Sequence, residues 1–492
     1  MTGKFKSQDG PPQLVGADLS PLQTRVENGH VVVPVGDDYV FSNDVLVEGL
    51  QPYPGARVPD AAARRSFPVP DQVGAYCDRA TFQRLPKYMA QWVHWPSRAN
   101  LILEGRYHEI PPVHYEGIFT LVCNFMCPHC SRRVTRTNWV DGGTWAHTTE
   151  VERRNTMHPD GMKRVIDEMA TLRVDHQMGI VWGGGDPTAN PFTYDAMLYA
   201  RSMGIHASFL TNGVYLEPER ALAAEPILIR ISLNCGTEET YRKFHGYPKG
   251  LDAFGRVRSV MRRLARLKVE QGANTLIGIS LIMDERNLSD MDAAAAEIAS
   301  VVQDAGGGID YVIVRPVMNY SHFPSKWAKL DGDTTQRAWE MVEEGGTLHR
   351  AITEKLGIPL VPIKDSFSSA PPAESYEGSS CLAYGMAGEI RHNGDVQLCS
   401  DSYGNPEYTI GNVFTETLKD IWTSDRRLDV LNQVNGKECF KTSCPHNSRG
   451  HHYNRLFHQI ERYRASGEMG IVRRWVEDLR DTTYPLGHSF FL

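Results

Sequence analysis

The sequence predicts an α/β fold built on a parallel sheet, and three observations point to it. Apolar runs typical of strands alternate with amphipathic helical segments between residues 111 and 330. Six such units imply parallel strands joined by right-handed crossovers. A cysteine cluster and several glycine and asparagine motifs follow the predicted strands, at the carboxyl edge where parallel sheets place their sites.

The elements follow in order along the chain. Strands are expected at residues 117–122, 179–182, 206–211, 226–233, 276–283 and 310–315. Helices are expected at Asp160–Leu172, Tyr194–Met203, Leu251–Val269 and Leu288–Val302. We expect one long amphipathic helix at 331–356 and a Ser/Pro-rich linker at 367–373. The expected units are an extension at 1–110, a core at 111–330, a helix and linker at 331–375, and a C-terminal domain at 376–492.

Composition narrows the class of protein. With 492 residues the chain exceeds one typical core, so two or three folding units are expected. A net charge of −7 argues against nucleic acid as the main partner. The sequence contains no apolar run that could span a bilayer and no signal-peptide core. We therefore expect a cytosolic enzyme with no membrane partner.

The cysteines are concentrated rather than spread along the chain. Seven of the nine fall in two clusters, which fits metal binding in a reducing compartment better than disulfides. Cys77 stands alone in the Pro- and Gly-rich extension and is expected to be a structural or idle thiol. The extension shows short strand signals near 31–35 and 39–41, and we assign it no function.

Cys123, Cys127 and Cys130 form the most informative motif, with C-x3-C-x2-C spacing inside eight residues. Three soft thiolates this close can converge on one iron–sulfur cube. A [4Fe–4S] cluster takes four thiolates, so three local ones leave one iron open to another ligand. The alternative is a zinc knuckle completed by a histidine or a distant cysteine, although zinc sites usually pair their cysteines as C-x2-C.

A glycine turn follows the second predicted strand, at Gly184-Gly185-Asp186. The cysteine motif followed by this turn resembles the radical S-adenosylmethionine (SAM) superfamily. The resemblance implies a partial (β/α)6 radical SAM barrel whose open iron binds the amino and carboxylate groups of SAM's methionine. It also implies that the turn holds the methionine amine, with Asp186 where the family usually has a glutamate.

The same resemblance assigns further contacts to SAM. The segment after the fourth strand contacts the ribose in that family, which points to Ser232 and Asn234; a strand-end hydroxyl that caps backbone explains Ser232 equally well. His129 stands before the last cysteine, where the family generally has an aromatic residue, and its ring could border the adenine.

Two residues are candidates for catalysis at the strand ends. Arg315 suits the SAM carboxylate or an anionic substrate group, and a salt bridge at the barrel rim is the equal alternative. Cys235 could return a hydrogen atom to a substrate radical, whereas a buried small apolar role is the simpler interpretation. In the family, one electron from the reduced cluster cleaves SAM to a 5′-deoxyadenosyl radical, so a donor such as flavodoxin or ferredoxin is implied.

A second cysteine set lies near the C-terminus. Its members are Cys381, Cys399, Cys439 and Cys444, with an Asn393-Gly394 pair that predicts a type I′ hairpin. This region resembles the SPASM and shorter Twitch auxiliary-cluster domains of radical SAM enzymes. Four cysteines suffice for one closed [4Fe–4S] cluster, so a Twitch-like form with an electron relay or fold staple is expected. An all-cysteine zinc site is the alternative.

The order of landmarks also resembles radical SAM enzymes that act on sugars and aminoglycosides. Shared features are the run from Cys130 to Thr135, the turn continuing to Asn190-Pro191, the strand Arg230–Asn234, and residues 309–316 followed by Tyr320. The resemblance implies oxidation, epimerisation or elimination on a sugar, aminocyclitol or nucleoside of a natural-product pathway.

Two other function classes stay open. One is radical SAM modification of a ribosomally made peptide, for which auxiliary-cluster domains are also common. Such enzymes often carry a leader-binding domain of three strands and three helices, and residues 1–110 lack a convincing helix trio. The other is a non-catalytic iron–sulfur or zinc scaffold, which would be saturated by protein ligands and would not bind SAM.

Overall fold

The computed structural model describes residues 96–130, 155–172, 178–247, 250–317, 332–362, 380–400, 405–436 and 449–482, and the backbone of short strands between residues 25 and 40. These short strands pair as β1 (Arg25–Glu27) with β2 (His30–Val32) and β3 (Pro34–Val35) with β4 (Tyr39–Val40). Several predictions lie outside the described residues: the linker at 367–373, Cys77, Cys439 and Cys444.

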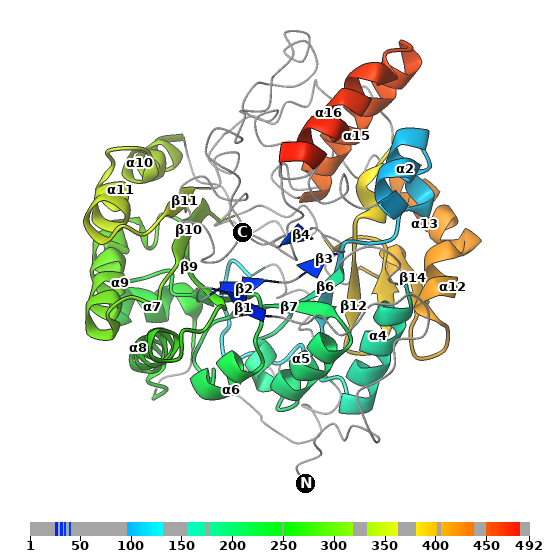
Figure 1. The fold of residues 1–492 in the computed structure, drawn as a ribbon. Helices are drawn as coiled ribbons and strands as arrows, with labels where there is room; N and C mark the ends of the chain where they lie inside the picture. The colour runs from blue at the N-terminus through cyan, green and yellow to red at the C-terminus, as the bar shows by residue number, and fades with distance from the viewer. Residues whose placement is uncertain are drawn as a thin grey trace.

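A curved ten-stranded sheet is the centre of the part of the chain that the structure describes (Figure 1). Seven of its strands are parallel neighbours: β5 (His114–Ile118), β6 (Met178–Trp182), β7 (Ile205–Thr211), β8 (Leu228–Ser232), β9 (Leu276–Met283), β10 (Tyr311–Pro316) and β11 (Leu360–Pro362). The α/β class and five of the six predicted strands are therefore confirmed, the first strand is shifted toward the N-terminus, and β11 was not predicted.

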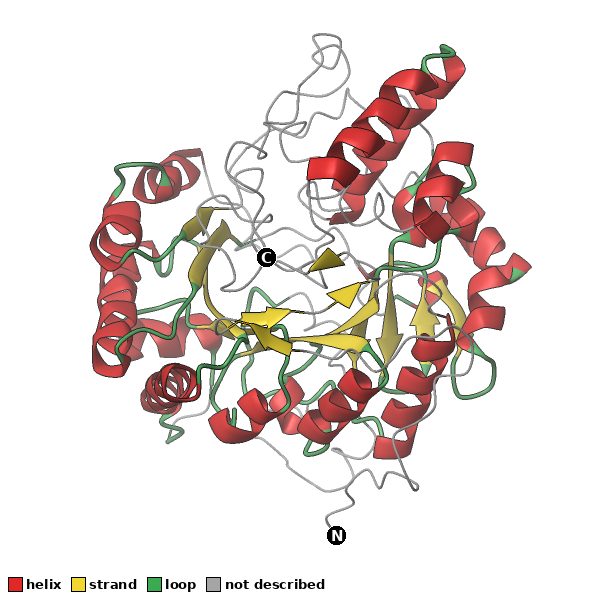
Figure 2. Cartoon of the chain, viewed as in Figure 1, coloured by secondary structure: helices red, strands yellow, loops and turns green. Residues whose placement is uncertain are grey.

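Helices cover the outer face of this sheet (Figure 2). Four match the predicted positions: α4 (Pro159–Leu172), α5 (Thr193–Ser202), α8 (Ala253–Gln271) and α9 (Met291–Ala305). The sequence did not reveal α6 (Pro218–Ala223), α7 (Glu238–His245) or the short turns η6 (Pro187–Ala189) and η7 (Leu288–Asp290). Helix α7 begins where the Thr237 side chain accepts from Thr240 N and ends at Gly246, which adopts the left-handed conformation.

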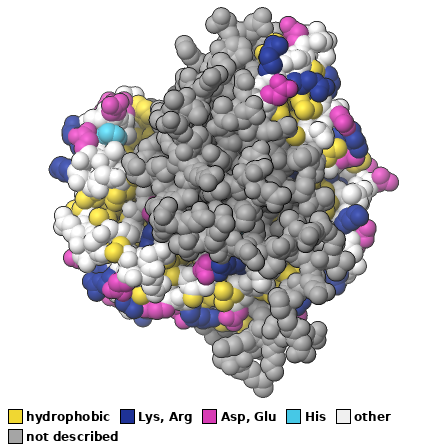
Figure 3. Space-filling view, in the orientation of Figure 1, with side chains coloured by type: hydrophobic (Ala, Val, Ile, Leu, Met, Phe, Trp, Pro, Cys, Tyr) yellow, Lys and Arg dark blue, Asp and Glu magenta, His cyan; other side chains and the backbone are white. Residues whose placement is uncertain are grey.

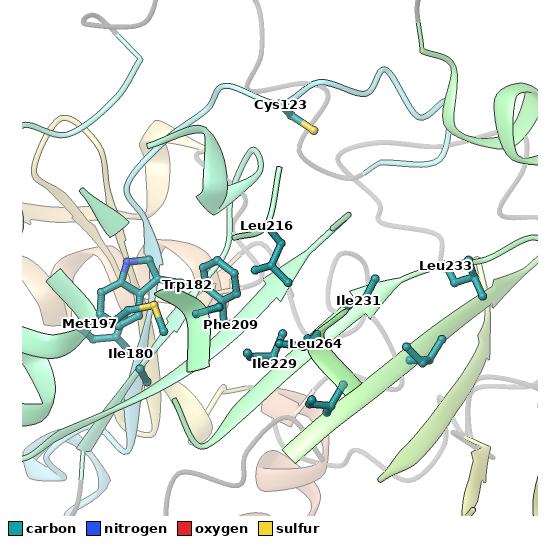
Figure 4. Close-up of a cluster of buried hydrophobic side chains, with 14 of the residues drawn as sticks. Cys123, Ile180, Trp182, Met197, Phe209, Leu216, Ile229, Ile231, Leu233 and Leu264 are labelled. Carbon is teal, nitrogen blue, oxygen red and sulfur yellow. The ribbon is translucent and has the colours of Figure 1, made fainter. Parts of the chain in front are cut away.

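The main hydrophobic core lies between the sheet and these helices. Strand residues alternate, so that Ile229 and Ile231 of β8 enter the core while Arg230 between them is only partly buried. Figure 4 shows this core, with Trp182 of β6 and Phe209 of β7 packed together. The opposite face of the sheet carries both polar and apolar side chains, and its apolar ones, such as Val181 and Leu228, belong to a second core.

Two predicted elements differ from the structure. The first strand ends at Ile118 rather than residue 122, because the following residues bond to a turn and to Asn155 instead of a strand. The helix predicted at 331–356 is broken into α10 (Gly332–Val342), α11 (Thr347–His349) and the π-helical turn η9 (Arg350–Glu354). The break falls at Gly345, whose φ of +79° is not helical.

The C-terminal domain extends the same sheet. Strand β12 (Ala387–Arg391) pairs in parallel with β5, and β13 (Asp395–Gln397) and β14 (Thr409–Asn412) follow in antiparallel order. The predicted hairpin is confirmed but its type I′ turn is wrong. Only Gly394 has a positive φ there, and its N–H donates to the Arg391 carbonyl in a three-residue loop.

Short helices complete this domain: η12 (Ala383–Gly385), η14 (Pro406–Tyr408), α12 (Leu418–Thr423) and α13 (Asp425–Gly436). Trp422 of α12 donates its indole N–H to the Ile110 carbonyl at 2.9 Å, which ties the domain to the segment before β5.

A second core joins the two ends of the described chain. Helix α2 (Pro96–Glu104) and turn η4 (Tyr107–Glu109) pack with α15 (Arg449–Ala465) and α16 (Met469–Thr482). Figure 1 shows α2 beside this C-terminal helix pair. Charged side chains of both signs alternate along the visible rim of the described surface (Figure 3). Among the described helices, none has the length and hydropathy needed to cross a membrane.

Candidate active site

The three barrel cysteines lie on the loop that leaves β5. Cys123 is buried, Cys127 and Cys130 are partly exposed, and none of the described cysteines forms a disulfide. The loop is anchored at Met126, whose N–H donates to the carbonyls of His245 and Gly246 at the end of α7. Figure 4 shows Cys123 on this loop, set apart from the strand residues of the core.

The glycine turn packs directly against the cysteine loop. Gly185 N donates to the Thr120 carbonyl at 2.8 Å, and Asp186 N donates to the Val122 carbonyl at 2.7 Å. A Cβ at Gly185 would lie 2.0 Å from the Val122 oxygen, so only glycine allows this approach. Gly184 has a φ of +105°, which also favours glycine. The turn and the cysteine loop are therefore in direct contact, and the predicted contact of the two glycines with SAM stays a prediction.

Asp186 holds the turn to the end of β7. Its buried carboxylate accepts from Thr188 N at 3.0 Å, Thr211 Oγ1 at 2.9 Å and Asn212 N at 2.7 Å. Burial raises the pKa of this carboxyl, while these donors act in the opposite direction. The carboxylate therefore already has donors from this chain, and its predicted contact with the SAM amine stays a prediction.

N–H groups point at the sulfurs of two of the cysteines. Cys123 Sγ accepts from Phe125 N at 3.4 Å and from Asn212 Nδ2 at 3.7 Å. Cys127 Sγ lies 3.3 Å from His245 Nδ1. Donors of this kind stabilise thiolates, the form in which cysteine binds metal.

His245 is a buried ring that sequence reasoning missed. Burial lowers its pKa to about 3, against the opposing effect of the Leu233 carbonyl, so the ring is neutral. Its Nε2 lies 3.5 Å from Asn234 Nδ2. A thiolate at Cys127 can only accept, so it is hydrogen-bonded to the neutral ring in the tautomer that carries its proton on Nδ1.

Asn234 connects β8 to β9 at this point. It is buried with a φ of +60°, and its Oδ1 accepts from Ile282 N at 2.8 Å. Asn287 donates to its carbonyl at 2.7 Å. These contacts give Asn234 a structural role, and the predicted ribose contact stays a prediction. Ser232 ends β8 opposite Ser280, is partly exposed, and keeps the same status.

His129 is held by a charged pair. Arg286 donates from Nη2 to His129 Nδ1 at 3.0 Å and forms an ion pair with buried Asp284. The ring also packs on Phe244, with centroids 4.3 Å apart. Burial lowers the pKa of His129 well below its usual value, and the charges of Arg286 and Arg315 lower it further. Because a guanidinium only donates, the neutral ring carries its proton on Nε2.

The two catalytic candidates occupy different environments. Arg315 lies near the end of β10 and is partly buried, and its charge lowers the pKa of His129. Cys235 is fully buried in the main core, and burial raises the pKa of its thiol. The core environment fits the apolar interpretation of Cys235. Both catalytic roles stay predictions.

Two of the four C-terminal cysteines lie among the described residues. Cys381 precedes η12, Cys399 follows β13, and both are partly exposed. Cys381 Sγ lies 3.3 Å from Asn454 Nδ2 of α15. Across the described residues no three His, Cys, Asp or Glu side chains meet at a single-ion site. A cube spreads its ligands over separate iron corners, so its thiolates need not meet at one point.

Comparisons with known proteins match both sites. The radical SAM superfamily profile matches residues 118–298, and an iron–sulfur cluster-binding domain profile, SPASM, matches residues 381–445. The mycofactocin maturase MftC of Mycobacterium tuberculosis is 26% identical over 63% of this chain and 70% of its own.

Two further relatives and one solved structure are also similar to this chain. The serine-type anaerobic sulfatase-maturating enzyme of Bacteroides thetaiotaomicron is 22% identical over 62% of this chain and 73% of its own. The Fe-coproporphyrin III synthase of Methanosarcina barkeri is 26% identical over 35% and 37%. The structure of Streptococcus suis SuiB bound to S-adenosylmethionine aligns over 67% of this chain and 69% of its own, with 18% identity and a TM-score of 0.46.

The described residues fit the cofactors of these domains. Three cysteines that form no disulfide share one loop, nitrogen atoms lie close to two of their sulfurs, and the glycine turn leaves no side chain between itself and the loop. The radical SAM domain binds a [4Fe–4S] cluster and SAM, and the SPASM domain binds auxiliary iron–sulfur clusters. The chain is a radical SAM enzyme with a C-terminal SPASM domain.

Proposed function

We propose that this radical SAM enzyme is a maturase that takes a hydrogen atom from a carbon of a peptide or protein. The observation that carries the proposal is the alignment, over 63% and 62% of this chain, with two enzymes named for maturation. One of them is named for maturing a sulfatase, which is a protein. The sugar, aminocyclitol or nucleoside expected from the sequence has less support, since none of these relatives is named for such a substrate.

The face of the sheet opposite the main core carries charged side chains among apolar ones. Arg230 of β8 and Arg315 of β10 lie on the face opposite the main core. Because β12 pairs in parallel with β5, this face continues into the C-terminal domain, where Glu389 stands beside Glu116. Glu389 is buried and forms an ion pair with Arg391 at 2.6 Å. Arg230 and Arg315, which are only partly buried, are therefore the charged groups on this face that a polar peptide could contact.

The chain's own residues orient the cofactors. When bound, the reduced cluster and SAM supply a carbon radical that can take hydrogen from an unactivated C–H bond. Cys123, Cys127 and Cys130 would hold the cluster, and Gly185 would let the turn approach it. A flavodoxin or ferredoxin is our proposed electron donor. The cytosolic location stays a prediction.

One labelled extract tests the substrate class. Cells that make this protein are grown in deuterated water, and their extract is incubated anaerobically with the reconstituted enzyme, unlabelled SAM and dithionite. We expect deuterium in 5′-deoxyadenosine, and we expect protease treatment of the extract, followed by protease removal, to abolish that label. Label that survives protease treatment would contradict the proposal and support the small-molecule alternative.

A further inference from the structure

Helix α15 lies beyond the residues that either family profile matches, yet it contacts the second cysteine site. Its apolar side, with Leu456, Phe457 and Ile460, is fully buried in the second core. This packing fixes the helix relative to η12 and α2. A side chain that flanks this apolar side of α15 can therefore be held at a defined position near Cys381.

Asn454 is that side chain. It is 1% exposed, and its Oδ1 accepts from two backbone groups, Leu382 N at 2.6 Å and Ala383 N at 2.9 Å. Backbone N–H groups only donate, so the oxygen must face them and the amide orientation is settled by its partners. Nδ2 is then directed at Cys381 Sγ, 3.3 Å away. The contact is a donor aimed at sulfur.

Cys381 is also fixed from other directions. Its backbone N–H donates to Asn435 Oδ1 of α13 at 2.8 Å. The carbonyl of Ser380 accepts from His458 Nε2, one turn further along α15, at 2.8 Å. Helices α13 and α15 thus hold this cysteine between them, which keeps the distance between its sulfur and Asn454 constant.

We propose that Asn454 is a positioning residue that donates a hydrogen bond to the Cys381 thiolate and raises the reduction potential of the auxiliary cluster. The inference rests on Cys381 being a cluster ligand and is independent of the substrate class. A donor on a ligand sulfur stabilises the more electron-rich reduced cluster. Burial strengthens the effect, because the surrounding dielectric is low.

Three variants distinguish an effect of Asn454 on the reduction potential from a purely structural role. Asn454→Asp keeps an oxygen for the two backbone N–H groups but places a second oxygen at the sulfur. Asn454→Ala removes both interactions. Asn435→Asp adds a carboxylate near Cys381 while keeping the acceptor for its N–H, and so controls for added charge.

The readout is the midpoint potential of each cluster, from a redox titration monitored by electron paramagnetic resonance, with iron and sulfide counted per chain. The barrel cluster, recognised by its response to SAM, is the internal reference. We expect Asn454→Asp and Asn454→Ala to lower the reduced-to-oxidised ratio of the auxiliary cluster about tenfold at a fixed potential, which is about 59 mV for one electron. We expect a smaller change for Asn435→Asp.

Two results would overturn the proposal. One is an unchanged auxiliary potential in Asn454→Asp, which keeps the backbone bonds and is expected to fold, whatever happens to Asn454→Ala. The other is an equal shift in Asn435→Asp and Asn454→Asp, since added charge would then explain the change without a lost donor.

Discussion

The two cysteine sites are built in opposite ways. The barrel site collects three thiols on one loop of eight residues, between β5 and the end of α7. The C-terminal site places Cys381 before a short helical turn and Cys399 after β13, with the β12–β13 hairpin between them. A local motif can be read from spacing alone, whereas a dispersed one depends on the tertiary fold to bring its ligands together.

Both sites nevertheless receive a side-chain donor from a distant part of the chain. His245 is 118 residues from Cys127, and Asn454 is 73 residues from Cys381. In each case the donor's other polar atom faces a partner: Asn234 for the histidine, and backbone N–H groups for the asparagine. The cysteines of the two sites differ in how close together they lie in the sequence. The side-chain donors to their sulfurs come from distant parts of the chain at both sites.

Removing the three barrel cysteines should have the largest effect, because it should eliminate one site and leave the other in place. We expect Cys123, Cys127 and Cys130 replaced together by alanine to abolish 5′-deoxyadenosine formation, because the cluster loses all its local ligands. Iron should remain at the C-terminal site, measured per chain after anaerobic reconstitution. A Cys235→Ala chain is the control that should keep both clusters, and SAM cleavage by the triple variant would refute the assignment.

The turn that faces the barrel cysteines gives the next largest effect. In Gly185→Ala the new Cβ would lie 2.0 Å from a backbone oxygen, so the turn must move away from the loop. We expect SAM affinity to fall at least about tenfold, equivalent to ~1.4 kcal/mol, in equilibrium dialysis of the reconstituted protein.

A matched control lies two residues earlier in the same turn. A Cβ at Gly183 would meet its nearest atom, Ile118 Cδ1, at 4.0 Å, which is ordinary contact. Gly183→Ala should therefore bind SAM within about twofold of the unchanged protein, a difference of less than about 0.5 kcal/mol. Equal losses in both variants would mean that the close approach of Gly185 is not what the turn requires.

The parts that sequence could predict are those with a strong local signal. The six strands alternate with long amphipathic helices, and the cysteine and glycine motifs have fixed spacing. Helix α7 has eight residues, shorter than the window over which helical periodicity is visible, so His245 at its end gave no signal. Asn212 could have been found, since it directly follows the strand predicted at 206–211.

The remaining features depend on packing between distant segments. The pairing of β12 with β5 joins residues far apart in sequence, and the residue pattern of a strand does not predict which strand it pairs with. Helix α2 lies inside a segment whose Pro and Gly content suggests an irregular extension, yet its partner is α15 near the other end of the chain. Asn454 belongs to this second core, so its contact with Cys381 could not be anticipated.

The smallest expected effect concerns the donor at the barrel site. His245→Phe keeps a ring beside Phe125 but has no N–H, and His245→Gln places its amide near the position of Nε2 rather than Nδ1. His245→Asn can keep a donor near the position of Nδ1. We expect the phenylalanine and glutamine variants to lower the reduction potential of the barrel cluster, because a donor to the Cys127 sulfur favours the reduced state. We expect the asparagine variant to keep a reduction potential close to that of the unchanged protein.

The same titration distinguishes this tuning from a packing defect. A tenfold change in the reduced-to-oxidised ratio is about 59 mV for one electron, and we expect a shift no larger than that. The auxiliary cluster should keep its potential in all three variants, since His245 contacts only the barrel loop among the two sites. If the asparagine variant shifts as far as the phenylalanine variant, the ring acts through packing, and the parallel with Asn454 fails.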